Sequence, residues 1–155
     1  MSQKSISLGV RAIIKKNDSF IVVEHNEEKH GKFFIFPGGG IENGETIFEA
    51  TQREVLEETN LNVRANKIVY IRETRLGKDT GIEFYVLCEF IDGEMKLGSD
   101  PELSDNKQVL TKLKALSIDE LNNEKWYPEE LNDILQNDNI KGFEEFRYLG
   151  LKSFD

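Results

Sequence analysis

The chain has 155 residues, of which 38% are hydrophobic, and it carries a formal net charge of −9 at pH 7. This length fits a single domain over residues 1–155 with a sizeable buried core, and the ordinary apolar fraction argues against disorder. Because an acidic surface repels phosphate backbones and anionic lipid headgroups, the composition disfavours nucleic-acid and membrane partners.

The one cysteine, Cys88, excludes a disulfide framework and favours a cytoplasmic setting. It lies in the apolar run "FYVLCEF", residues 84–90, where a buried strand residue is a simpler interpretation than a nucleophile. The first ten residues contain no hydrophobic signal core, and no apolar run approaches transmembrane length.

The first part of the chain is expected to form strands over residues 5–16, 19–25 and 32–36. Asn17 and Asp18 favour a turn between the first two strands, and Pro37 ends the third. His25 and His30 flank the polar loop before the third strand, so we interpret both as exposed loop residues.

The third strand, "KFFIF", is rich in aromatic residues. Phe33, Phe34 and Phe36 are candidates for stacking on a nucleobase. Alternation along the strand requires that at least one of them belong to the core, so both interpretations stay open.

A glycine-rich turn follows, with glycine at positions 38, 39, 40 and 44, and then a predicted helix over residues 46–59. Glu, Ala, Gln, Arg and Leu favour helix, and neither glycine nor proline interrupts the segment. Phe48, Thr51 and Val55 fall on one stripe, which we expect to face the core.

Three carboxylates, Glu54, Glu57 and Glu58, share another face of this helix, because they stand at i, i+3 and i+4. Like charges at this spacing cost roughly 0.2–0.5 kcal/mol per pair, and the last turn of a helix prefers cations. Glu49 and Arg53 have the spacing of a favourable pair, but one arginine cannot neutralise the cluster. A hard divalent cation such as Mg²⁺, Mn²⁺ or Ca²⁺ would neutralise it.

An acidic helix alone is most simply a solvated surface. The preceding glycines change that interpretation, because they permit tight turns and close approach of backbone to a ligand. Mg²⁺ is typically held by a few carboxylates and completes its shell with waters and substrate phosphates. The combination therefore indicates a metal–phosphate site.

Further strands are expected over residues 61–75, 82–90 and 107–116. Ser117 and Glu120 have capping-box spacing, and Pro128 suits the first turn of a helix over residues 128–137. The aromatic tail, residues 142–155, is expected to pack on the body. Because the hairpins exclude a purely parallel sheet, we predict an α/β fold with a mixed, partly antiparallel sheet covered by helices.

The segment from Gly39 to Leu61 resembles the Nudix box of the Nudix hydrolases, and "FPGG" is the usual sequence before it. The residues on box positions are Gly39, Glu45, Arg53, Glu54, Val55, Glu57, Glu58 and Leu61. The family has glycine where this chain has Asn60, and asparagine is the next best residue for the left-handed end of a helix. The resemblance implies the α/β/α sandwich of the Nudix fold.

The resemblance also implies an enzyme that hydrolyses a nucleoside diphosphate linked to another moiety. Such enzymes split a phosphoanhydride bond with water and Mg²⁺ or Mn²⁺. Carried over by position, Glu54, Glu57 and Glu58 are the carboxylate metal ligands, and the carbonyl of Gly38 is a further ligand. The partner implied is a nucleotide-type small molecule, and a homodimer is compatible with this interpretation.

Two candidates compete for the general base. Glu54 belongs to the box, while Glu102 lies in the later loop "DPELSD", from which family members also recruit a base. The resemblance further implies that Arg53 and Glu45 form an ion pair that holds the glycine turn against the helix.

The substrate is left open between a nucleoside triphosphate and a nucleotide sugar. Arg72 and Arg75, near the outer end of a predicted strand, are candidates for contact with a phosphate. The alternative function is a non-catalytic Nudix-fold module that senses ligands or binds proteins. Such members usually lose box glutamates, and this chain retains them all.

Overall fold

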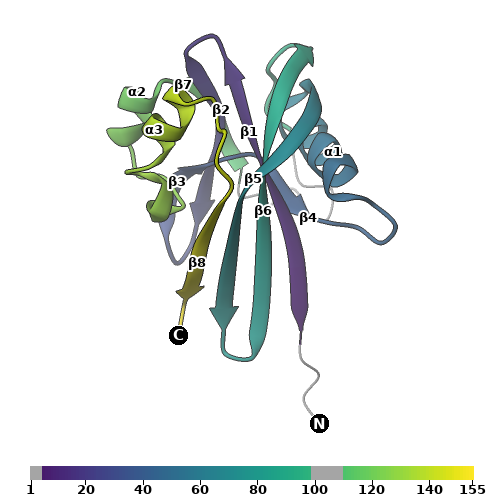
Figure 1. Cartoon of the computed structure of the whole chain (residues 1–155), viewed down its shortest axis with the longest axis vertical. Helices are drawn as coiled ribbons and strands as arrows, with labels where there is room; N and C mark the ends of the chain where they lie inside the picture. Colours follow the sequence, from purple (N-terminus) through teal and green to yellow (C-terminus); the bar gives the residue numbers. More distant parts are fainter. Residues whose placement is uncertain (1–4, 99–109) are drawn as a thin grey trace.

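The computed structural model describes residues 5–98 and 110–155, which form a mixed sheet with helices on both sides (Figure 1). The strands are β1 (Ile6–Lys16), β2 (Ser19–Glu27), β3 (Gly31–Ile35), β4 (Gly38–Gly40), β5 (Asn62–Leu76), β6 (Asp79–Asp92), β7 (Leu110–Leu116) and β8 (Arg147–Ser153). The helices are α1 (Ile47–Thr59), α2 (Ile118–Asn122), the 3-10 helix η2 (Glu129–Leu131) and α3 (Leu135–Ile140). The predicted α/β class and mixed sheet are confirmed.

The sheet runs in the order β3-β2-β1-β6-β5-β8, with β4 paired to β1 and β7 paired to β2. β1 pairs with β6, and β5 with β8, in parallel, while the hairpin neighbours are antiparallel. The segment 38–40, predicted as a turn, is therefore a short strand opposite residues 9–11 of β1. This pairing fixes the glycines against the sheet.

Two apolar clusters lie on the two faces of the sheet. One contains Val55 of α1 with residues of β1, β5 and β6. The other contains Leu121 of α2 and Leu135 of α3, together with aromatic residues of the sheet. Figure 1 shows α1 on one side of the strands and α2 and α3 on the other, which is the α/β/α arrangement implied by the sequence. None of the helices in the described ranges is long and apolar enough to cross a bilayer.

Helix α1 begins and ends close to the predicted limits, 46–59. Thr46 caps the helix in a reciprocal capping box: its hydroxyl accepts the N–H of Glu49, and the Glu49 carboxylate accepts the N–H of Thr46. Asn60 ends the helix with φ of 63°, in the left-handed conformation expected for this position, and its side chain donates to the carbonyl of Glu94 at 3.0 Å.

The core face of α1 differs in one residue from the expectation. Thr51 and Val55 are fully buried, but Phe48 is 37% exposed. In the first turn Ile47 packs against the core cluster and Ala50 is fully buried instead, so the prediction for Phe48 was wrong. Glu58, predicted on the carboxylate face, is buried.

The prediction of one helix over residues 128–137 is also wrong, because the chain forms two separate helices there, η2 and α3. Pro128 precedes the first turn of η2, whose bonds Leu131 N–H to Pro128 O and Asn132 N–H to Glu129 O are of the tight i to i+3 type. Asn132 and Asp133 between the two helices are weak helix formers, since their side chains compete for backbone hydrogen bonds.

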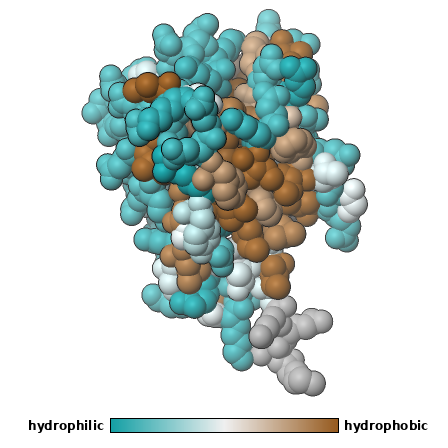
Figure 2. Space-filling view, in the orientation of Figure 1, coloured by the Kyte–Doolittle hydropathy of each residue, from teal (hydrophilic) through white to brown (hydrophobic). Residues whose placement is uncertain are grey.

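The tail packs on the body as predicted, and it does so as strand β8 beside β5. The buried carboxylate of Asp138 accepts a hydrogen bond from the Tyr70 hydroxyl at 2.7 Å and two from Arg147 at 2.7 and 2.8 Å. These bonds tie α3 to β5 and β8. Figure 2 shows apolar residues gathered over the central strands between hydrophilic outer elements.

Candidate active site

Arg53 joins the glycine strand β4 to the acidic face of α1. Its guanidinium contacts Glu45 at 2.7 and 2.9 Å, Glu54 at 3.0 Å and Glu57 at 3.2 Å. It also donates to the carbonyl of Gly40 at 2.9 Å. The predicted ion pair between Arg53 and Glu45 is present in the structure, and one planar cation donates hydrogen bonds to three carboxylates and a backbone carbonyl.

These contacts stabilise the charged forms of Arg53 and Glu45. Hydrogen bonds to Glu45 foremost, and then to Glu54, raise the pKa of Arg53 above its ordinary value. Hydrogen bonding from Arg53 lowers the pKa of Glu45. The Oε1 atom of Glu45 also accepts from the backbone N–H of Glu42 at 2.8 Å, so the carboxylate fixes the connection between β4 and α1.

Glu58 lies deeper than its neighbours and accepts a hydrogen bond from the backbone N–H of Gly38 at 3.1 Å. Glycine is required here by close packing. A Cβ on Gly38 would stand 1.9 Å from the carbonyl oxygen of Val10, and one on Gly39 would stand 2.5 Å from Oε1 of Glu54. The carboxylates of α1 therefore lie directly against the backbone of β4.

The carboxylate oxygens of Glu54, Glu57 and Glu58 are the type of ligand that a hard divalent cation prefers. Glu54 and Glu57 both reach the Nη1 atom of Arg53, so their oxygens converge on one point, and Glu58 lies beside Gly38. Within residues 5–98 and 110–155, however, no group of three acidic, histidine or cysteine side chains is already arranged as a metal-ligand cluster. The carboxylates are held instead by Arg53 and by the backbone.

A row of charged side chains crosses the sheet beside this site. Arg72 of β5 lies opposite Glu83 of β6 and donates to its Oε1 at 2.9 Å, while Arg11 of β1 donates to Oε2 at 3.3 Å. Arg11 also donates to the carbonyl of Phe36 at 3.1 Å, just before the glycine strand. Burial alone would lower the pKa of Arg11, but the negative charges of Glu83 and Glu58 raise it. We call Arg11, Glu83 and Arg72 the charged row.

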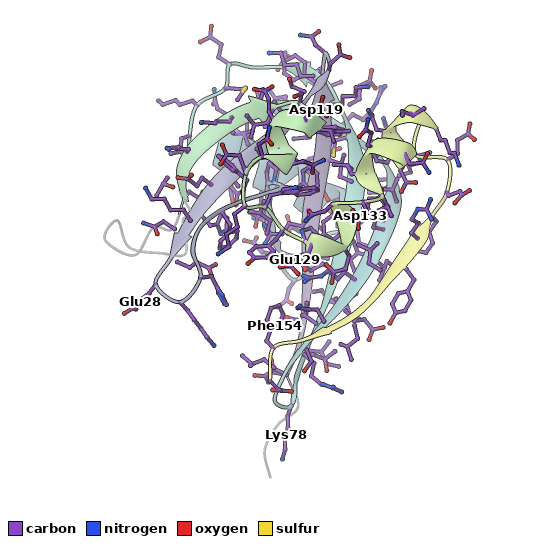
Figure 3. The ribbon with its side chains drawn as sticks, turned by 90° about the vertical axis from the view of Figure 1, so that its left-hand side faces the viewer. Glu28, Lys78, Asp119, Glu129, Asp133 and Phe154 are labelled. Atoms are coloured by element: carbon purple, nitrogen blue, oxygen red, sulfur yellow. The ribbon has the colours of Figure 1, made fainter. Side chains whose placement is uncertain are left out.

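Two hollows flank the charged row. The first, which we call the aromatic cavity, has a volume of about 410 Å³ and is lined by Phe33, Tyr127, Arg72 and Glu130 among others. Figure 3 shows two further lining residues, Glu129 and Phe154, on the side of the molecule that carries α2 and α3.

The second hollow, which we call the glycine-lined cleft, has a volume of about 350 Å³. Its lining includes Arg11 and Glu83 of the charged row and Gly39 and Gly40 of β4. No residue of α1 is among its described lining residues, but Gly39, which lines it, lies against the carboxylate of Glu54.

The candidates for phosphate contact and base stacking differ in where they lie. Arg72 reaches the aromatic cavity, whereas Arg75 is exposed and its nearest acidic partner is Asp155 at 3.9 Å. Phe33, Phe34 and Phe36 are all buried, and Phe33 alone among these three lines the aromatic cavity. Glu102 lies outside the described residues.

The two histidines differ. His30 is exposed, as predicted, and lines the aromatic cavity. His25 belongs to β2 and is largely buried, so its interpretation as an exposed loop residue was wrong. Its ring packs 5.5 Å from that of Phe33, and its Nε2 atom has no hydrogen-bond partner among the described residues. Burial, and then the charge of Arg11, lowers the pKa of His25 to about 4.

Sequence reasoning missed the charged row apart from Arg72. Arg11 and Glu83 are 72 positions apart, and only the parallel register of β1 with β6 brings them together. The signal that was available is the presence of charged residues inside otherwise apolar strands, at "GVRAII" and "GIEFYV".

A comparison with protein families matches the NUDIX domain to residues 6–137. The ADP-ribose pyrophosphatase of Methanocaldococcus jannaschii is 31% identical over 96 residues, covering 61% of this chain and 57% of that protein. Nudix hydrolase 6 of Arabidopsis thaliana is 26% identical over 152 residues, covering 94% of this chain and 50% of that protein. The chain thus spans about half the length of these curated relatives.

Among solved structures, a NUDIX hydrolase from Nitrosomonas europaea superimposes with a TM-score of 0.71 and 22% identity, covering 93% of each chain. Identity at this level shows a shared fold. The layers and sheet described above therefore have close counterparts in solved structures.

Proposed function

The chain belongs to the NUDIX domain family, and on that premise we propose that it hydrolyses a phosphoanhydride bond in a nucleoside diphosphate linked to another moiety, with Mg²⁺ or Mn²⁺ as cofactor. The observation that carries the proposal is the convergence of Glu45, Glu54 and Glu57 on Arg53, beside the backbone of the glycine strand. A solvated acidic surface has no need of such an arrangement.

In this proposal Glu57, Glu58 and the carbonyl of Gly38 hold the cation, with Glu54 beside them. The bound cation would neutralise phosphate oxygens and acidify water. The carboxylate of Glu54 takes a proton from the attacking water while the water oxygen bonds to phosphorus. The bridging oxygen of the phosphoanhydride then leaves with the electrons of the broken P–O bond. Arg53 and Glu45 act by position, because they hold β4 and α1 together.

The aromatic cavity is the proposed place for the nucleoside. Phe33 and Tyr127 offer ring faces and edges to a base. Arg72 lines this cavity and Arg11 lies near Glu58. In this proposal the two arginines contact the phosphates that connect the base to the reacting centre. The name of the Methanocaldococcus relative, an ADP-ribose pyrophosphatase, agrees with a substrate of this general class.

The test is product release from a panel of nucleoside triphosphates, ADP-ribose and nucleotide sugars, with and without Mg²⁺ or Mn²⁺. We expect metal-dependent release of nucleoside monophosphate or of pyrophosphate from at least one class. Glu54→Gln should abolish most of it, while Glu49→Gln on the same helix keeps the capping box and should retain it. Binding of nucleotides without hydrolysis by the wild type would favour the non-catalytic alternative.

A further inference from the structure

We propose that Gly98 is a positioning residue for the carboxylates at the end of α1. It belongs to residues 93–98, which we call the strap, and the strap follows β6 and bonds to the last turn of this helix. The inference rests on the proposed function, because it takes Glu57 and Glu58 to hold the cation. It adds what fixes the backbone of these two residues.

The strap supplies hydrogen-bond donors to the last turn of α1, where helix carbonyls have no partner within the helix. The N–H of Gly98 donates to the carbonyl of Glu58 at 2.8 Å, and the N–H of Lys96 donates to that of Thr59 at 3.0 Å. None of residues 56–59 is basic, so no side chain of this turn offsets the negative end of the helix dipole. The two N–H groups reduce the negative potential at the turn that carries two carboxylates.

Gly98 lies directly against the backbone of Glu57. A Cβ at position 98 would stand 1.7 Å from the carbonyl oxygen of Glu57 and 3.2 Å from the Cα of Glu58. The φ of Gly98 is not positive, so this position requires glycine because of the contact and not because of the backbone conformation. A larger residue must therefore displace either the strap or the turn that carries Glu57 and Glu58.

Glu58 is held through both its backbone and its side chain. Its carbonyl accepts the N–H of Gly98, and its carboxylate accepts the N–H of Gly38 at 3.1 Å. Gly38 is fixed in turn, because a Cβ there would stand 1.9 Å from the carbonyl oxygen of Val10. Glu58 thus connects two backbone segments that leave no room for a Cβ, and a displacement of either segment changes where its carboxylate lies.

The beginning of the strap is anchored at the residues that follow the carboxylates. The carbonyl of Glu94 accepts a hydrogen bond from the Asn60 side chain at 3.0 Å, and Met95 packs against the apolar cluster beneath α1. Gly93 has φ of 107°, and a Cβ there would stand 2.7 Å from the carbonyl oxygen of Asn60. Because the strap is fixed before it reaches Gly98, a clash at Gly98 is transmitted to the helix.

The experiment measures the affinity for Mn²⁺ in the absence of nucleotide. Gly98→Ala should weaken Mn²⁺ binding by about 10- to 100-fold, the range typical when a residue that orients metal ligands is changed. Gly142→Ala is the matched control. Gly142 has φ of 73°, so alanine is strained there, but no atom lies within 4 Å of the added Cβ. This variant should lose thermal stability and keep the wild-type affinity for Mn²⁺.

Amide hydrogen exchange of the wild type gives a second measurement that needs no substitution. If the strap orients the metal ligands, a bound cation must stabilise the strap in return, because coupling between two sites is reciprocal. Saturating Mg²⁺ should therefore slow exchange at the amide of Gly98. The amide of Asn123 is the control, since it bonds to the carbonyl of Glu120 at the end of α2, and its exchange should not change.

Two kinds of result would contradict the inference, and they are distinguishable. Equal Mn²⁺ affinities of Gly98→Ala and Gly142→Ala, or exchange at Gly98 that Mg²⁺ leaves unchanged, would overturn the role of Gly98 and leave the hydrolytic function in place. If Glu57→Gln binds Mn²⁺ as tightly as the wild type, the cation is not held at this end of α1. The metal assignment of the proposed function would then fail, and the inference with it.

Discussion

Arg53 and Glu45 meet in a two-point ion pair, with Nε 2.7 Å from Oε2 and Nη2 2.9 Å from Oε1. The same carboxylate accepts the N–H of Glu42, and the same guanidinium donates to the carbonyl of Gly40. The pair therefore connects the glycine strand, the turn after it and α1 through two side chains. Its planar geometry is one that a lysine ammonium cannot reproduce.

Arg53→Lys should consequently lower kcat by on the order of 10²-fold, since small errors in the position of reacting groups are costly. The measurement is kcat at saturating Mg²⁺ on a confirmed substrate. Arg64→Lys is the control, because Arg64 pairs with Glu89 while 65% exposed, and that change should be nearly silent. Equal effects of the two substitutions would show that the geometry of Arg53 is unimportant.

Divalent metal should raise the thermal stability of the wild type, because a ligand that binds the folded state alone stabilises it by mass action. Replacing Glu57 and Glu58 by Gln should remove most of the shift in Tm produced by Mg²⁺ or Mn²⁺. Glu49→Gln on the same helix keeps its capping box and should respond to metal like the wild type. An unchanged metal response in the double variant would place the cation elsewhere.

The general base is tested by two single substitutions. If Glu54 takes the proton from water, Glu54→Gln should cost on the order of 10²–10⁴ in rate, and Glu102→Gln should be nearly silent. The rates are to be measured at saturating Mg²⁺ on a confirmed substrate. The reverse order of effects would assign the base to the loop that contains Glu102, and full activity of Glu54→Gln would refute the assignment made here.

His25 should make stability depend on pH below neutrality. The pKa of His25 is about 4 in the folded chain and ordinarily 6.5, so between these values the unfolded chain binds more protons. The free energy of unfolding therefore falls as pH drops from 6.5 to about 4, by up to about 3 kcal/mol from this residue. Urea unfolding of His25→Phe should show a smaller loss over this range than the wild type.

His30→Phe provides the control for that measurement, because His30 is exposed. Its pH dependence should follow the wild type. If the two variants and the wild type lose the same stability between pH 6.5 and 4, the pKa of His25 is not lowered in the folded protein and the prediction is wrong.

Asp138 should matter for stability more than its neighbour Glu145, although both contact Arg147. Asp138 is 3% exposed and accepts hydrogen bonds from the Tyr70 hydroxyl and from Arg147, so Asp138→Asn removes the charge from a buried group with three hydrogen bonds. We expect a loss of about 2–4 kcal/mol in the free energy of unfolding. Glu145 is 62% exposed, and Glu145→Gln should change stability by less than about 1 kcal/mol. Denaturant unfolding of the two variants decides the comparison.

Local signals predicted helix α1 and its ion pair well. The run of good helix formers placed α1 correctly, and Asn60 adopts the left-handed conformation expected where the family has glycine. The ion pair of Arg53 with Glu45 followed from box positions within nine residues of one another. All of these features depend on contacts between residues close in the chain.

The features that could not be predicted depend on register. Glu83 joins Arg11 and Arg72 because β6 lies between β1 and β5, a strand order that periodicity along one strand does not reveal. His25 shows the same limit, since its burial depends on packing beside Phe33 and near Arg11. The break between η2 and α3 depends on competition between backbone and side-chain hydrogen bonds at Asn132 and Asp133.

The proposed chemistry and the proposed recognition come from different parts of the chain. The carboxylates, Arg53 and the glycine strand all lie between Gly38 and Thr59, whereas the two hollows draw their distinguishing side chains from β1, β3, β5, β6, β8 and the segment around Tyr127. Substitutions in those strands can change what is bound without disturbing the short catalytic segment. A lineage that keeps this segment can therefore acquire new substrates by drift at the distant positions, and laboratory selection for altered specificity should begin with them.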